Sequence, residues 1–215
     1  VVIGDETYKL HHIPSGILNA GAMNVVCPGV VLNPPTILDE ISGLEQRGIE
    51  VGGRLMISDR VHVVFPWHLE EDRVLNDRPV NGENIGTTLR GIGPCYRDKV
   101  GRSFAVRLGD LYRESFDEKV QQIVTAKDRI LASIAVNSEV APLDAVQIAQ
   151  DYRGYAEQLE PFVADTTTYL LDAVEQDRHI LYEGAQGSLL DIDHGTYPFV
   201  TSSNSSGVGV SAGSG

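Results

Sequence analysis

The sequence is poor in cysteine. Its two cysteines, Cys27 and Cys95, lie far apart and belong to no Cys-x-x-Cys pair. Paired or clustered cysteines are what a disulfide framework or a structural zinc site requires. We therefore expect neither, and we expect both thiols to be free, as is usual in the reducing cytosol.

Positive charge is also scarce. Lys and Arg number 17 against 30 Asp and Glu, which gives a formal net charge of −13 and a pI near 4.8. Because the summed field of such a protein repels polyanions, we expect no binding to nucleic acid or to an anionic membrane. A local cluster of cations can still bind a small anion.

Long apolar runs are absent as well. No stretch approaches the ~20 apolar residues of a membrane-spanning helix, and no basic-then-apolar signal segment opens the chain. We therefore expect a cytoplasmic protein. The first residue is not methionine and the chain stops within a glycine- and serine-rich tract, so we also expect a fragment of something longer.

Short apolar runs and one helical pattern alternate in the first third of the chain. The runs typical of strands are 1–3, 8–10, two within 24–33, 54–58 and 62–65. A helix is predicted from Thr36, which could cap it, to Gly48, with its apolar residues on one face. This alternation predicts an α/β fold with a mainly parallel sheet and flanking helices.

The middle of the chain, 110–177, changes character. Apolar residues recur there at helical spacing in 116–134, 143–159 and 162–174. We predict a helical subdomain inserted into the sheet or laid across it. The pattern typical of a strand returns at 180–182.

The segment 84–102, NIGTTLRGIGPCYRDKVGR, reverses the charge of the surrounding chain. It holds adjacent hydroxyls at Thr87 and Thr88 and four cations against one acid. Glycines let a backbone approach a ligand closely, hydroxyls donate to phosphate oxygens, and Arg adds a charged fork. We predict a loop that binds a phosphate ester, and a solvated glycine-rich surface turn is the alternative.

A second segment, 183–204, reads EGAQGSLLDIDHGTYPFVTSSN. Polar groups beside glycines at the ends of short strands are where open α/β sheets bind their ligands. Asp191-x-Asp193-His194 has the letters of a metal cluster but too few ligands, so we expect no metal there. Residues 207–212 match a dinucleotide fingerprint in letters alone, without the strand and the acidic residue that it requires.

Taken in this order, these segments resemble adenylosuccinate synthetase, the family that joins aspartate to inosine monophosphate (IMP) with GTP. The matching segments are IPSGIL (13–18), 85–102, GDL (109–111) and 183–204. The resemblance covers essentially all of 1–215 and implies a single fragment of one larger α/β domain, similar in fold to the P-loop NTPases. It places the family's GDEGKGK-type phosphate loop, catalytic aspartate and catalytic histidine before residue 1. The aspartate-binding and guanine-binding segments would follow Gly215.

The resemblance implies roles for residues at the phosphate end of IMP. Thr88 and Thr201 match two threonines that bind the 5′-phosphate. Arg102 matches an arginine that reaches the partner subunit's nucleotide across a homodimer interface. Arg90 and Lys99 fall on matching basic positions and are possible additional contacts.

Gln186 matches a glutamine beside the purine 6-position. In the family reaction the 6-oxygen attacks the γ-phosphate of GTP, and the amine of aspartate then displaces the phosphoryl group. Negative charge builds at O6, so a fixed amide donor there assists catalysis without changing its protonation. The resemblance further implies Mg²⁺ in the complete enzyme, held mostly by groups outside this chain.

Two other functions remain open from the sequence. One is the phage-type relative that uses a guanine nucleotide in place of IMP. The other is a non-catalytic module in which 84–102 serves nucleotide binding or dimerisation alone.

Overall fold

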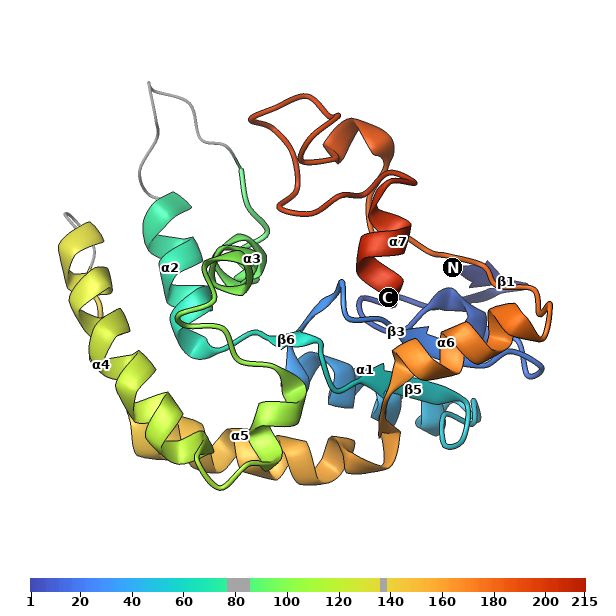
Figure 1. Ribbon diagram of the computed structural model, residues 1–215, viewed down its shortest axis with the longest axis horizontal. Helices are drawn as coiled ribbons and strands as arrows, with labels where there is room; N and C mark the ends of the chain where they lie inside the picture. The colour runs from blue at the N-terminus through green and yellow to red at the C-terminus, as the bar shows by residue number, and fades with distance from the viewer. Residues whose placement is uncertain (77–85, 136–138) are drawn as a thin grey trace.

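The computed structural model describes residues 1–76, 86–135 and 139–215 (Figure 1). The chain begins with an antiparallel hairpin of β1 (Val2–Ile3) and β2 (Glu6–Thr7). Its second strand lies slightly before the predicted 8–10, although the Tyr8 N–H still donates to the Val1 carbonyl at 2.8 Å. A short 3-10 helix, η1 (Ser15–Leu18), follows.

Two small parallel sheets lie at the centre of the fold. The strands are β3 (Asn24–Val26), β4 (Val31–Leu32), β5 (Leu55–Ser58), β6 (His62–Val63) and β7 (Val163–Ala164). β5 lies between β3 and β7, and β4 pairs with β6, all in parallel. Parallel neighbours need long crossover connections, which helices supply here. The predicted α/β fold with a mainly parallel sheet is confirmed.

The first helix, α1 (Pro34–Gln46), begins earlier than predicted. Its cap is Asn33, whose Oδ1 accepts the Thr36 N–H at 3.3 Å, so the prediction of Thr36 as the cap is wrong. The two prolines of the first turn have no N–H to satisfy, and this allows the helix to start there. Gly48, with φ +78°, follows the end of the helix as predicted.

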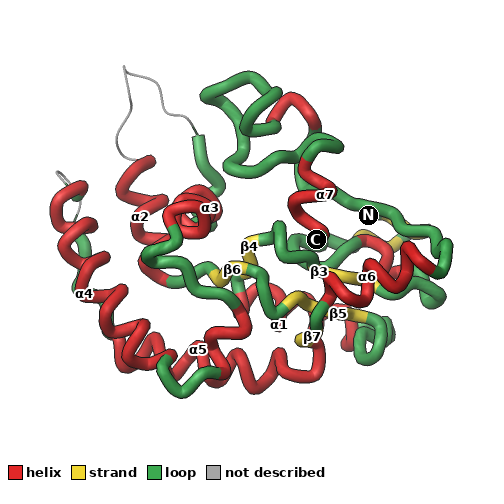
Figure 2. Tube along the Cα trace, viewed as in Figure 1, coloured by secondary structure: helices red, strands yellow, loops and turns green. Residues whose placement is uncertain are grey.

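Six further α-helices surround the sheets in the described part of the chain (Figure 2). They are α2 (Pro66–Asn76), α3 (Ile92–Gly101), α4 (Phe116–Ile134), α5 (Ala145–Leu159), α6 (Thr166–Glu175) and α7 (Gly209–Ser214). Short 3-10 turns are η2 (Leu108–Tyr112), η3 (Glu160–Phe162) and η4 (Ser188–Leu190). None of the helices seen in the described residues is long and apolar enough to cross a bilayer.

An aromatic stack joins the helical middle of the chain to the sheets. The Phe65 ring stacks on Tyr152 of α5 with centroids 4.0 Å apart, and on Trp67 of α2 at 4.2 Å. The Tyr152 hydroxyl donates to the Val64 carbonyl at 2.7 Å in a buried position. Stretch 110–177 therefore packs on the sheet through α5, and it also contains β7, which pairs with β5.

Two further sequence predictions of local structure are wrong. Residues 92–101 were predicted as loop but form α3. Pro94 lies in the first turn of this helix, where a missing N–H costs nothing. Residues 180–182 were predicted as a strand but form no regular structure, and Leu181 is 91% exposed. A strand needs a neighbour to pair with, and none of the described strands lies against this segment.

Candidate functional site

Loop 86–91, in which residues 86–90 are exposed, leads directly into α3, and a carboxylate of α2 holds it. Asp72 Oδ1 accepts the Thr87 hydroxyl at 2.7 Å, and Asp72 Oδ2 accepts the Gly91 N–H at 2.9 Å. Thr88 and Arg90 lie between these two anchors with exposed side chains. The first residues of the predicted phosphate-binding segment, 84 and 85, lie outside the described part of the chain.

The two remaining cations of the predicted site are Lys99, which lies in α3, and Arg102, which follows its last residue. The Lys99 amine donates to the carbonyls of Pro28 and Gly29 at 3.1 and 3.2 Å, and burial lowers its pKa. The Arg102 backbone ends α3 with φ +67°, and its side chain is exposed. None of the described residues pairs with the Arg102 guanidinium. Lys99 is thus already engaged, whereas Arg102 is available to a ligand or a partner.

A buried network of charges lies beneath α3. Lys127 of α4 is fully buried, and its amine lies 2.9 Å from Glu71 Oε1 and 2.6 Å from Asp98 Oδ2. Arg97 also pairs with Glu71. His68 Nδ1 accepts the Phe65 N–H at 3.0 Å, and His68 Nε2 accepts the Trp67 indole N–H at 3.0 Å and lies 3.0 Å from Asp98 Oδ2. This network fixes α2, α3 and α4 to one another.

The pKa values of two network residues follow from these contacts. Burial alone would raise the pKa of Asp98, but hydrogen bonds from His68 and Lys127 outweigh it and lower that pKa. Burial lowers the pKa of His68, against the opposing effect of Asp98. The His68 imidazole is therefore neutral and the Asp98 carboxylate is charged in the folded state.

Segment 183–206 is braced by two carboxylates. Glu183 Oε2 accepts the Ser15 N–H at 2.9 Å and its hydroxyl at 2.6 Å, which ties IPSGIL to EGAQG. Asp191 is fully buried and accepts the N–H groups of Asp193, His194 and Ser206 at 2.9–3.1 Å. These bonds stabilise the charged form and lower the pKa of Asp191. Its role in the described structure is to hold the loop.

The two predicted segments meet at the first turn of α3. A Cβ placed on Gly93 would lie 3.2 Å from the Ser202 hydroxyl, so Ser202 packs directly on the helix backbone. Burial raises the pKa of Tyr96, one turn further on, although its hydrogen bond with Ser203 opposes the rise. Figure 1 shows the C-terminal loop beside α3.

Some of the predicted site residues lie next to the contact between Gly93 and Ser202, and others do not. Thr201 precedes Ser202 and is half-buried, with its N–H donating to the Leu190 carbonyl at 2.8 Å. Thr88 and Arg90 lie just before α3. Gln186 is exposed at the other end of the second segment, and no described contact brings it to Thr88 or Thr201.

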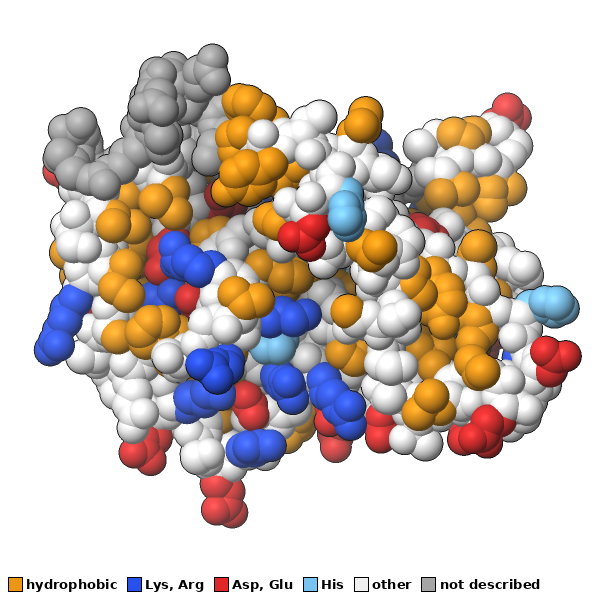
Figure 3. All heavy atoms as spheres, turned by 45° about the horizontal axis from the view of Figure 1, so that its top comes forward, with side chains coloured by type: hydrophobic (Ala, Val, Ile, Leu, Met, Phe, Trp, Pro, Cys, Tyr) orange, Lys and Arg blue, Asp and Glu red, His pale blue; other side chains and the backbone are white. Residues whose placement is uncertain are grey.

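Cationic side chains gather on one face of this acidic protein (Figure 3).

Burial lowers the pKa of His62 to about 4, and the charges of Lys99 and Arg107 add to this effect. Burial also lowers the pKa of His12 to about 4, and its Nε2 accepts the Asn33 N–H at 3.3 Å. Both imidazoles are thus neutral in the folded state.

These two histidines predict a loss of stability in mild acid. In the unfolded chain they take up protons below about pH 6.5, but in the folded state only below about pH 4. The free energy of unfolding should therefore fall by roughly 2–4 kcal/mol between pH 7 and pH 4.5. Denaturant titrations at both pH values measure this, and His12→Gln should flatten the dependence. Equal stability at both pH values would contradict neutral buried imidazoles.

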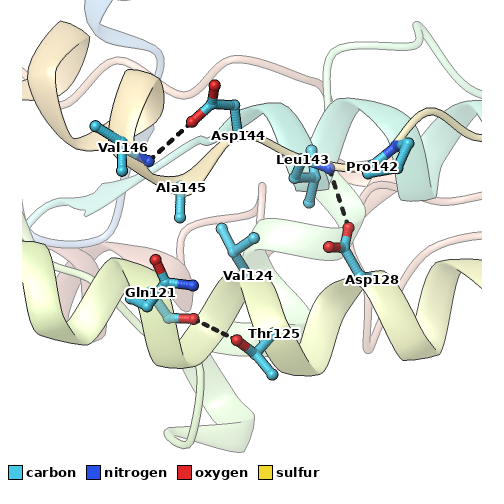
Figure 4. Close-up of a pocket in the computed structure, with 9 residues that line it drawn as sticks. All are labelled: Gln121, Val124, Thr125, Asp128, Pro142, Leu143, Asp144, Ala145 and Val146. Carbon is cyan, nitrogen blue, oxygen red and sulfur yellow. Dashed lines mark hydrogen bonds between the residues drawn. The ribbon is translucent and has the colours of Figure 1, made fainter.

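A shallow hollow between α4 and α5 is a different feature (Figure 4). It is lined by Gln121, Val124, Thr125, Asp128 and Pro142 to Val146. Its carboxylates are occupied, because Asp144 accepts the Val146 N–H and Asp128 accepts the Leu143 N–H. It includes no residue of either predicted segment.

Sequence reasoning missed the buried carboxylates and their cation. One signal was present for Lys127. It lies four residues after Ile123 and four before Leu131, on the apolar stripe of α4. A lysine on a buried face needs a paired carboxylate, so the position itself indicated an ion pair.

Comparisons with known proteins identify the family of this chain. The family model of adenylosuccinate synthetase matches residues 1–215. The adenylosuccinate synthetases of Streptomyces griseus and of Clostridium botulinum (strain Okra) are each 44% identical over all of this chain, which covers 49% and 50% of their lengths. The chain thus spans about half the length of these relatives.

Two solved structures are also similar to this chain. The fully ligated adenylosuccinate synthetase of Plasmodium falciparum has a TM-score of 0.84 at 30% identity, over 100% of this chain and 49% of that one. A cyanophage S-2L succinoaminodeoxyadenylate synthetase, bound to dGMP and dATP, has a TM-score of 0.58 at 20% identity over 98% of this chain and 46% of its own, and shares the fold. The chain belongs to the adenylosuccinate synthetase family.

Proposed function

We propose that this chain is the IMP-binding part of a longer enzyme that forms adenylosuccinate from IMP and L-aspartate with GTP hydrolysis. One observation carries the assignment of the site. Ser202 packs on Gly93, so two segments far apart in sequence share one surface at the start of α3. The complete enzyme would be a cytoplasmic purine-biosynthesis ligase that binds GTP and Mg²⁺ and acts as a homodimer.

Thr88 and Thr201 would donate their hydroxyls to the 5′-phosphate, and Arg90 would add charge from the same loop as Thr88. Arg102 would reach the partner subunit's nucleotide, which fits its exposed guanidinium at the end of α3. These contacts orient the base and take no part in the bond changes. Lys99, engaged by two carbonyls, would act on the site through the position of α3.

Gln186 would donate its amide to O6 of the purine as negative charge develops there. Its exposed position leaves its side chain open to a ligand. The two aspartates of the same segment do not fit Mg²⁺. Asp191 already accepts three backbone N–H groups, and Asp193 accepts the Asn204 amide at 2.6 Å. Mg²⁺ would therefore be bound by GTP and by groups outside this chain.

IMP binding tests the proposal. Calorimetry on the folded chain should show weak IMP binding, and Thr201→Ala or Arg102→Ala should weaken it about 10-fold, since a hydrogen bond to a charged group contributes about 1.5–3 kcal/mol. Thr125→Ala, on the exposed face of α4, is the matched control and should bind as the wild type does. No heat with IMP from a demonstrably folded dimer would count against the pocket.

The same titration separates the alternatives. Preference for dGMP over IMP would favour the phage-type activity, which the cyanophage enzyme's fold similarity brings into consideration. A dimer that binds neither nucleotide would favour an assembly module.

A further inference from the structure

We propose that Asp72 is a positioning residue that sets the conformation of loop 86–91 for the phosphate of the nucleotide. The inference rests on the proposed function and adds to it a residue that touches no substrate. Asp72 is only 8% exposed, and both of its carboxylate oxygens are occupied, one by the Thr87 hydroxyl and the other by the Gly91 N–H.

The two contacts bracket the residues that face solvent. Thr87 and Gly91 are held at 2.7 and 2.9 Å, and Thr88 and Arg90 lie between them. The position of the Thr88 hydroxyl therefore depends on both anchors. A phosphate site needs its donors fixed before the ligand arrives, because ordering them on binding costs affinity.

The backbone of this loop needs such a restraint. Leu89 has φ +56° and Gly91 has φ +71°, and the left-handed region is unfavourable for leucine. The Thr87 hydroxyl also accepts the Leu89 N–H at 3.1 Å, so it relays the hold of Asp72 to the strained residue. Without Asp72, the loop would lose the contacts that hold Thr87 and Gly91, and the strained backbone at Leu89 would be freer to relax.

Asp72 is mounted on a rigid support. The preceding residue, Glu71, is fully buried and pairs with Lys127 of α4 and Arg97 of α3. Helix α2 therefore cannot shift relative to α3 without breaking buried charge pairs. Two hydrogen-bond donors also partly offset the negative charge of the Asp72 carboxylate, which reduces its repulsion of a nearby phosphate.

The test compares IMP with inosine, which lacks the phosphate, on the full chain. Asp72→Asn retains one acceptor oxygen and should weaken IMP binding about 10-fold, Asp72→Ala should weaken it further, and inosine binding should stay unchanged. Thr87→Val should weaken IMP binding about as much as Asp72→Asn does. The double variant of Asp72→Asn with Thr87→Val should lose less IMP affinity than the sum of the two single losses, because both changes remove the same contact between these residues. Glu70→Gln, which alters a surface ion pair on the same helix, is the matched control.

Amide hydrogen exchange gives a readout that does not depend on the ligand. The Gly91 amide should exchange faster in Asp72→Ala and at the wild-type rate in Glu70→Gln. If wild type binds IMP and Asp72→Ala binds it equally well, or loses IMP and inosine affinity alike, the inference fails while the proposed function stands. If the folded wild-type chain binds no IMP, the proposed function fails and the inference fails with it.

Discussion

Replacing Lys127 with methionine is expected to lower the free energy of unfolding by about 3–5 kcal/mol. The amine lies within 2.9 Å of Glu71 and 2.6 Å of Asp98, and its side chain is 1% exposed. Methionine fills similar volume, so the loss comes from charge rather than from a cavity. Two buried carboxylates would remain with Arg97 as their cation, and one of them would have to take up a proton. Urea denaturation at pH 7 measures the change.

Lys119→Met is the matched control, since it is the same substitution on the same helix. Lys119 pairs with Asp110 at 2.8 Å, but its side chain is 36% exposed. Exposed pairs contribute little, so we expect a loss below about 1 kcal/mol. Similar losses in the two variants would contradict a special role for the buried network.

Gly91→Ala is expected to cost about 3 kcal/mol of stability and to disturb the loop that carries Thr88. Gly91 has φ +71°, and an added Cβ would lie 2.9 Å from the His68 carbonyl carbon and 3.0 Å from the Leu69 nitrogen. These are backbone atoms of α2 and cannot move aside cheaply. The penalty thus combines backbone strain with a steric clash.

Gly48→Ala separates these two causes. Gly48 has φ +78° but nothing within 4 Å of an added Cβ, so only the strain of about 1 kcal/mol should appear. Thermal or denaturant unfolding of both variants measures the difference. Equal losses would mean that the close approach of the loop to α2 is not tight.

The elements with clear periodicity could be predicted from the sequence. The apolar spacing of Phe116, Val120, Ile123 and Leu131 gave α4, and the alternation of short runs with helices gave the parallel sheets. Helix α3 could not be recognised, because its glycines at 93 and 101 and Pro94 are typical of a loop. They are tolerated because they lie in its first turn and at its end.

The two predicted segments could be identified from their residue types, but the carboxylates that hold them in place could not. Glu183 contacts Ser15, and Asp72 contacts Thr87, across different elements of the fold. No local pattern marks such a carboxylate, since its partners are backbone N–H groups and hydroxyls that any segment can supply. These pairings follow from how the helices pack, which composition and spacing do not encode.

The most direct test of a shared nucleotide site is NMR chemical-shift mapping of the folded, isotopically labelled chain during IMP titration. A single mononucleotide bound by both segments should shift the amide signals of 86–90 and of 201–203 together, with one dissociation constant. Shifts confined to one segment, or to the hollow between α4 and α5, would contradict it.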